Sequence, residues 1–176
     1  MGAPAGTVKL VGLLAALALA GCTHGLRGVP MTPPKSTGKV VASASVGEPD
    51  GVKVLWNGQT SGTDSRWKAW IAGSPDELEA VWDEAAFGDP PAIDFTKYVV
   101  IAEAGEGGVC NPRILGVDAE ASGLLRLRFD PDAMYRTCIL LATRIARIVA
   151  VPRRVLTATV VFMNGYAFEV PEVPFE

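Results

Sequence analysis

The side chains in this sequence that could carry chemistry are three cysteines, at positions 22, 110 and 138, and a single histidine, His24. A hydrolase of the Ser-His-Asp type needs an activated nucleophile with a base beside it. The chain has no Gly-x-Ser-x-Gly motif and no histidine after position 24. A zinc site needs clustered cysteine and histidine ligands, which these positions do not supply. The sequence therefore predicts a protein that is not an enzyme and that binds no metal or cofactor.

Cys22 is instead predicted to carry a lipid. It ends the motif Leu19-Ala20-Gly21-Cys22, which follows Lys9 and the apolar run 10–20, as in a secretory signal. The motif resembles the lipobox of bacterial lipoproteins, in which the cysteine becomes the acylated first residue of the mature protein. A run of 11 residues spans roughly 16 Å as a helix, about half of a bilayer core, so it does not span a membrane. The alternative is an ordinary signal peptide that is cut elsewhere.

The composition predicts three parts: a signal peptide over 1–21, a flexible tether over 22–39 and one domain over 40–176. The tether is inferred from glycine, proline, serine and threonine with few large apolar residues. Removal of residues 1–21 leaves 155 residues, enough for a substantial core. The net charge of -3 shows no basic excess, so nucleic acid is excluded as a partner.

Cys110 and Cys138 remain as a pair once Cys22 is assigned to the lipid. An oxidising envelope compartment favours a disulfide between them. The alternative is that each cysteine is buried separately as a small apolar residue.

One helix is strongly indicated. Ser74, Pro75 and Glu77 form a capping box with proline at the first helical position. Leu78, Val81, Trp82 and Ala85 then recur at helical spacing and predict one buried face over about eleven residues.

The other elements are predicted as strands and turns. A turn is expected at 105–108, Asn57-Gly58 is expected to end the strand over 53–56, and a hairpin is expected around Asn164-Gly165. The expected strands are 40–45, 53–56, 66–72, 98–103, 114–119, 124–129, 137–143, 145–151, 155–163 and 166–170. The predicted fold class is α+β: a mainly antiparallel sheet, curled or sandwich-like, covered by one helix.

Two surfaces are candidates for binding. Arg144, Arg147, Arg153 and Arg154 could form a patch for an acidic partner or lipid head groups, with ordinary solvent-facing arginines as the alternative. Four tryptophans, Trp56, Trp67, Trp70 and Trp82, could stack on envelope sugars. Trp82 lies on the apolar face of the helix and is expected in the core, and the opposite strand parity of Trp67 and Trp70 allows at most one of them to face outward.

A family resemblance adds a partner class. The later chain resembles the carboxy-terminal domain of the protease complex subunit PrcB family, over roughly residues 74–154. The residues that carry it are Glu79-Ala80-Val81-Trp82, Pro91 to Phe95 with Tyr98 to Ala102, Gly105 to Gly108, and Cys138 through Thr143 to Val151-Pro152-Arg153. The resemblance implies a small envelope lipoprotein that helps to assemble or stabilise a secreted protease complex, with no catalytic residues of its own.

The sequence thus favours a membrane-anchored, non-enzymatic interaction module of the bacterial envelope. Thr23 stands where an aspartate would signal inner-membrane retention, which favours the outer membrane. Two rivals remain: a small-ligand or glycan binder that uses an exposed tryptophan, and a hydrolase with an unrecognised pair of carboxylates.

Overall fold

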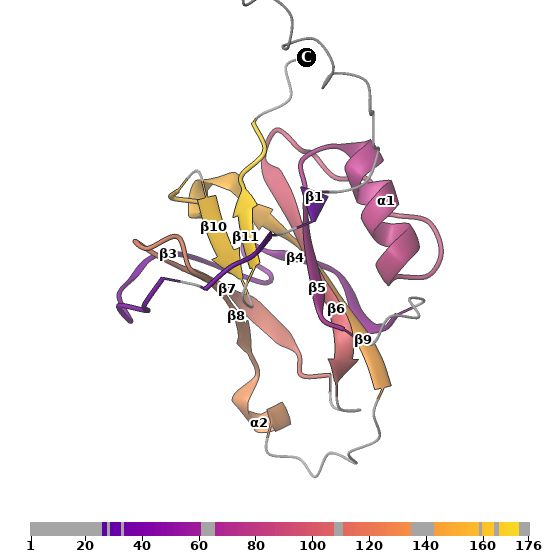
Figure 1. Cartoon of the computed structure of the whole chain (residues 1–176), viewed down its shortest axis with the longest axis horizontal. Coiled ribbons are helices and arrows are strands. Elements are labelled where there is room, and N and C mark those ends of the chain that lie inside the picture. The colour runs from indigo at the N-terminus through magenta and orange to yellow at the C-terminus, as the bar shows by residue number, and fades with distance from the viewer. Residues whose placement is uncertain are drawn as a thin grey trace, which may run out of the picture.

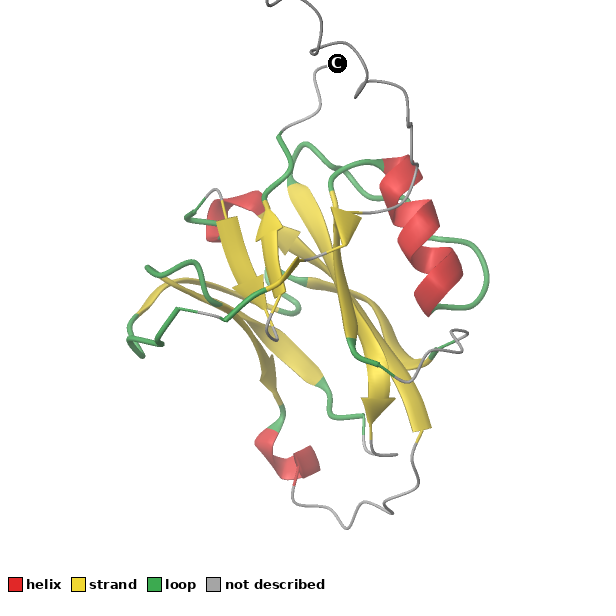
Figure 2. Cartoon of the chain, viewed as in Figure 1, coloured by secondary structure: helices red, strands yellow, loops and turns green. Residues whose placement is uncertain are grey.

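The computed structural model describes residues 26–27, 29–32, 34–60, 66–107, 111–134, 143–158, 160–163 and 166–172. Its central element is a five-stranded sheet in the order β1-β5-β6-β9-β4, in which every neighbouring pair is antiparallel. The strands are β1 Leu26–Arg27, β4 Lys53–Gln59, β5 Lys68–Ala72, β6 Tyr98–Gly107 and β9 Thr143–Pro152. Strands dominate the described chain (Figure 2).

Two three-stranded sheets cover one face of the central sheet (Figure 1). The first, in the order β3-β7-β8, comprises Val40–Ser45, Ile114–Glu120 and Leu125–Phe129. The second, in the order β10-β11-β2, comprises Val160–Met163, Tyr166–Glu169 and Val29–Pro30. A short helix α2 (Pro131–Met134) follows β8, and a 3-10 turn η1 (Arg153–Val155) follows β9. One core cluster lies between the sheets and includes Ile71, Ile101, Val117 and Val149.

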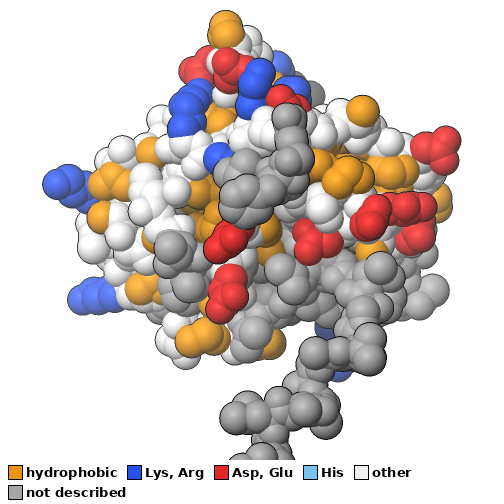
Figure 3. Space-filling model, turned by 90° about the horizontal axis from the view of Figure 1, so that it is seen from above, with side chains coloured by type: hydrophobic (Ala, Val, Ile, Leu, Met, Phe, Trp, Pro, Cys, Tyr) orange, Lys and Arg blue, Asp and Glu red, His pale blue; other side chains and the backbone are white. Residues whose placement is uncertain are grey.

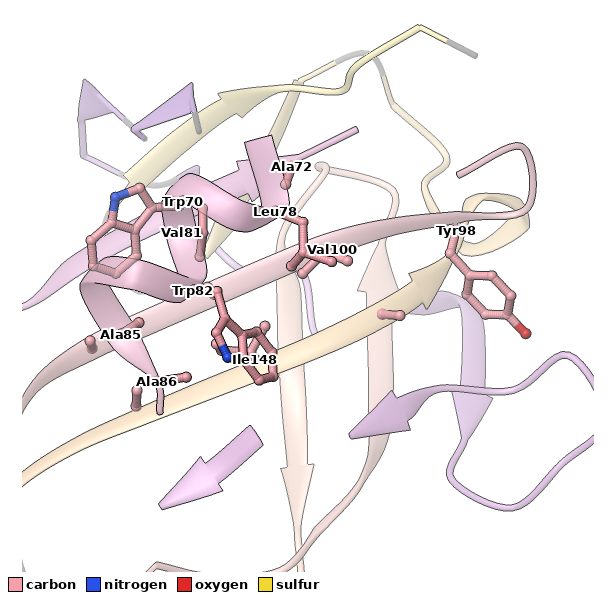
Figure 4. Packing of buried hydrophobic residues seen from close by; sticks show 14 of the residues in the cluster. Trp70, Ala72, Leu78, Val81, Trp82, Ala85, Ala86, Tyr98, Val100 and Ile148 are labelled. Atoms are coloured by element: carbon pink, nitrogen blue, oxygen red, sulfur yellow. The ribbon is translucent and has the colours of Figure 1, made fainter. Parts of the chain in front are cut away.

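The opposite face of the central sheet is covered by α1 (Pro75–Ala85). Ser74 caps the helix by accepting a hydrogen bond from the Glu77 amide, and the side chain of Glu77 accepts one from the Gly73 amide. The predicted face is buried: Leu78, Val81, Trp82 and Ala85 pack on Trp70, Val100 and Ile148 of the sheet (Figure 4). The predicted α+β fold with a mainly antiparallel sheet and one covering helix is confirmed.

Burial on both faces explains the continuous apolar runs in β6 and β9. In β6, Val99 and Ile101 face the two smaller sheets, whereas Val100 and Ala102 face α1. Alternate residues of a strand point to opposite faces, so a sheet covered on both sides needs apolar residues at nearly every position.

The predicted turn at 105–108 and the predicted strand end at Asn57-Gly58 are wrong. Gly105, Glu106 and Gly107 continue β6 and pair with residues 143–145 of β9. A Cβ built on Gly105 would lie 2.5 Å from the Trp67 ring, so glycine here allows close packing. Asn57-Gly58 likewise continues β4 and pairs with Arg147 and Ala146. Both stretches stay extended because each lies beside β9, which runs the full length of the sheet.

The predicted hairpin is found, since β10 and β11 pair from Val160↔Glu169 to Met163↔Tyr166. Its first strand begins at Val160 rather than at 155, because Arg153–Val155 form η1. Residues 164–165 and most of the strand predicted over 137–143 lie outside the described residues.

The segment predicted as a tether over 22–39 is partly integrated into the domain. β1 pairs with β5 through Leu26↔Ile71, and β2 pairs with β11 through Val29↔Ala167. Further along, Ser36 Oγ and the Thr37 amide donate hydrogen bonds to the carboxylate of Glu120, at 2.8 and 2.9 Å. Backbone pairing and one buried carboxylate hold a segment that has few large apolar residues.

Acidification is expected to release this attachment. Hydrogen bonding from Ser36 lowers the pKa of Glu120 despite the opposing effect of burial, with further help from Thr37 and Arg126. A lowered carboxyl pKa stabilises the folded state above the pKa of an unfolded glutamate, about 4.3, and this contribution is lost as the pH falls through the folded value. NMR protection of the Thr37 amide should therefore fall on titration from pH 7 to below 4. The matched variant Glu120→Gln should show low protection at every pH; a wild-type amide equally protected throughout would contradict the assignment.

Candidate functional site

The four arginines predicted as a partner surface do not form one patch. Arg144 and Arg147 lie in the first half of β9, whereas Arg153 and Arg154 follow its end in η1. A ten-residue strand is about 30 Å long, so Arg144 and the pair Arg153 and Arg154 stand at opposite ends of β9, with Arg147 near its middle. The arginines therefore have to be considered separately.

Arg153 holds the C-terminal segment in place. Its guanidinium donates to the backbone oxygens of Phe95, Pro171 and Glu172, at 2.9, 2.5 and 3.2 Å. Burial lowers the pKa of Arg153 from its ordinary value. Arg154 is exposed and donates to the Asp50 backbone oxygen at 3.2 Å. With its donors used inside the fold, Arg153 serves structure rather than an acidic partner.

Arg147 forms an ion pair inside the sandwich. Arg147 of β9 is the register partner of Glu103 of β6, and Arg147 Nη1 lies 2.5 Å from Glu103 Oε1. The Glu103 side chain is 2% exposed and that of Arg147 is 14% exposed. The guanidinium also lies 5.0 Å from the centre of the Phe129 ring and 5.9 Å from that of Trp67, within the range of cation–π attraction. The pair links the central sheet to the aromatic residues around it.

Several buried polar atoms around this pair have no hydrogen-bond partner: Glu103 Oε2, Arg147 Nε and Asn57 Oδ1. Their residues form one row across β6, β9 and β4, because Arg147 is the register partner of both Glu103 and Asn57. Asn57 Nδ2 donates to the Pro112 backbone oxygen at 3.1 Å. Unpaired buried polar atoms are rare in folded proteins. This row, which we call the polar row, is one candidate site.

Trp67 lies beside the polar row and is partly exposed, at 38%. Trp70 is 2% exposed and packs under α1. The two tryptophans thus differ as strand parity predicts, and Trp67 is the more exposed of the two. Strand parity in the sequence could have predicted the polar row, because a charged residue occupies a position on the apolar face of each of two strands. Glu103 shares parity with Val99 and Ile101, and Arg147 shares it with Ile145 and Val149.

A second candidate surface lies along β4, one of the two outer strands of the central sheet. Trp56 makes an edge contact with Trp82 at 6.1 Å between ring centres and a tilted contact with Phe87 at 5.9 Å. Phe87 is 55% exposed and Val54 is 37% exposed. No other described strand pairs with the outer side of β4. We call Trp56 and Phe87 with this strand edge the aromatic edge; it was not predicted because the contact between Trp56 and Phe87 joins positions 31 apart in the chain.

The predicted lipid site and disulfide fall on Cys22, Cys110 and Cys138, which lie outside the described residues. Among the residues that are described, no group of three histidine, cysteine, aspartate or glutamate side chains could hold a metal ion. The described helices include none that is long and apolar enough to cross a membrane.

The disulfide remains a prediction, and the described flanks are compatible with it. Gly107 and Thr143 are register partners, and Cys110 and Cys138 lie three and five residues from them along the chain. A bond closing a loop of 29 residues should stabilise the fold by roughly 3.5 kcal/mol in the chain-entropy model. Mass spectrometry of the exported protein without reductant should find no free thiol at either position. Two free thiols, or a Cα separation above about 7 Å, would rule the bond out.

Comparison of the chain with family models, with curated proteins and with solved structures finds no match.

Proposed function

We propose that this protein is a lipid-anchored, non-enzymatic interaction module of the bacterial cell envelope, accessory to a secreted protease complex. The observation that carries the proposal is Leu19-Ala20-Gly21-Cys22, placed directly before a folded domain. An acylated Cys22 would hold the domain at a membrane, since two or more chains anchor stably. The outer membrane is the favoured location, and the PrcB-like pattern over residues 74–154 supplies the protease as partner class.

The aromatic edge supports binding to another protein. Aromatic residues are enriched in protein interfaces and often dominate their binding energy. The outer strand of a sheet also offers backbone groups to which a partner strand can add. Phe87 is exposed, and its ring centre lies 5.9 Å from that of Trp56 on this outer strand.

The variant Cys22→Ser tests the anchor. We expect it to leave a folded domain but to release that domain from the membrane fraction, because the lipid is carried on this sulfur. Fractionation followed by immunoblotting measures the release, and circular dichroism of the purified protein checks the fold. Retention of the serine variant at the wild-type level would contradict the proposal.

Affinity capture of the lipidated protein from membranes tests the partner. A protease should be recovered reproducibly with the wild type and lost with Phe87→Ser. Val41→Ser is the matched control. Val41 is also an exposed apolar residue, at 44%, but it lies on β3 in another sheet. Capture without any protease argues against the accessory role, and equal capture by Phe87→Ser argues against the aromatic edge.

A small-ligand or glycan binder is the second candidate function. It is favoured by the partial exposure of Trp67 beside the unpartnered atoms of the polar row. Titration of intrinsic tryptophan fluorescence with envelope oligosaccharides tests it. A saturable change that is absent in Trp67→Leu would favour this function, and a flat titration would remove it.

A further inference from the structure

We infer that the domain is seated against the lipid surface by one end, with the opposite end held away from the membrane. The inference rests on the proposed lipid anchor at Cys22. It adds an orientation that the anchor alone does not give.

The first step is the length of chain between the anchor and the fold. This stretch runs from Cys22 to Leu26, and we call it the leash. Cys22 precedes β1 by only residues 23–25, and β1 is already paired with β5 through Leu26↔Ile71 and Arg27↔Trp70. Four Cα-to-Cα steps reach at most about 14 Å even when fully extended. A tether that ran to residue 39 would have allowed several times this distance. The pairing of β1 therefore shortens the leash to a fraction of the height of the domain.

The second step is the place where the leash joins the fold. β1 is antiparallel to β5, so it begins at the end of the sheet where β5 leads into α1. Tyr98 at the start of β6 pairs with Pro152 at the end of β9, at the same end. Gly73 packs against Pro171 there. We call this the anchor end; its exposed residues include Asp76 and Lys97.

The third step is the opposite end, which we call the distal end. It holds Glu106-Gly107 of β6 with Thr143-Arg144 of β9, and α2 lies on the same side of the molecule (Figure 1). The ten residues of β6 place the two ends about 30 Å apart, roughly twice the reach of the leash. The anchor end must therefore stay near the head groups, while the polar row lies near the middle of the sheet.

The surface charge of the anchor end does not supply the orientation. Viewed from above, this end shows both basic and acidic side chains (Figure 3). Lys97 lies 3.7 Å from Asp94, and the donors of Arg153 are directed to backbone oxygens. A mixed surface has little net attraction to anionic lipid, which requires a cluster of basic residues. The short leash, rather than charge, holds the anchor end against the bilayer surface.

The test measures proximity to lipid at two positions. A small fluorescent amino acid is placed in turn at Lys97, at the anchor end, and at Asp132 in α2. Each lipidated protein is reconstituted in phosphatidylethanolamine–phosphatidylglycerol vesicles that contain a lipid with a spin-labelled head group. We expect several-fold stronger quenching at Lys97 than at Asp132. Equal quenching at the two positions would overturn the inference.

Two matched insertions test the role of β1. About ten glycine and serine residues, with an average span of roughly 17 Å, are inserted either between Gly25 and Leu26 or between Pro34 and Lys35. The first insertion lengthens the leash and should weaken quenching at Lys97; the second lies beyond β1 and β2 and should leave it unchanged. Equal effects of the two insertions would show that β1 does not shorten the leash. Failure of the wild type to float with vesicles would instead contradict the lipid anchor itself.

Discussion

Replacement of Trp82 by alanine is expected to destabilise the domain by about 3 to 5 kcal/mol, the usual cost of truncating a buried large aromatic side chain. Trp82 is 4% exposed and lies between α1 and the central sheet, where Trp56 packs against its ring edge. Loss of the indole would leave a cavity on that face of the sheet. Because the total stability of a domain is typically about 5 to 15 kcal/mol, this one change should remove a large part of it. Urea denaturation measures the effect.

The control for Trp82→Ala is Glu79→Ala on the same helix. Glu79 is exposed, so its replacement should change the free energy of unfolding by no more than about 0.5 kcal/mol. If Trp82→Ala also fell within that range, the packing of α1 on the sheet would be wrong.

Replacement of Arg147 by methionine should have an effect of similar size, about 3 to 5 kcal/mol, because it leaves the buried carboxylate of Glu103 without its counter-charge. Glu103 is enclosed between the sheets, and its second oxygen already lacks a hydrogen-bond partner. Unfolding by urea at neutral pH measures the loss.

The double variant Glu103→Leu with Arg147→Met distinguishes the pair from simple loss of packing. Replacing both charges by apolar side chains of similar size is often neutral or stabilising. The double variant should therefore recover most of the stability lost in Arg147→Met. A double variant as unstable as the sum of both single variants would show that the charges do not act together.

The elements that could be predicted from sequence are those whose side chains repeat with a regular period. The cap at Ser74 and the spacing of Leu78, Val81 and Trp82 specify α1 and its buried face. The apolar runs of β6 and β9 specify two buried strands. These features are local, so a short window of sequence contains them.

The features that could not be predicted depend on neighbours distant in the chain. Gly105 and Gly107 have the composition of a turn, yet β9 holds them extended. β1 and β2 are joined to the domain through their backbones, and composition does not report backbone pairing. The polar row could have been predicted from strand parity, because Glu103 and Arg147 interrupt the apolar faces of the neighbouring strands β6 and β9. The aromatic edge required the contact between Trp56 and Phe87, 31 positions apart.

The pairing of β2 with β11 has a consequence for how the domain folds. Val29 is the register partner of Ala167, so the sheet of β10, β11 and β2 joins nearly the first described residues to nearly the last. A chain that leaves the ribosome or crosses a membrane N-terminus first cannot form this sheet until its final strand has emerged. Pairings between distant segments also slow folding, because the entropy of closing a long loop is lost before the contact forms. β2 should therefore be among the last of the described strands to find its partner, and its edge should stay unpaired until β11 has been made.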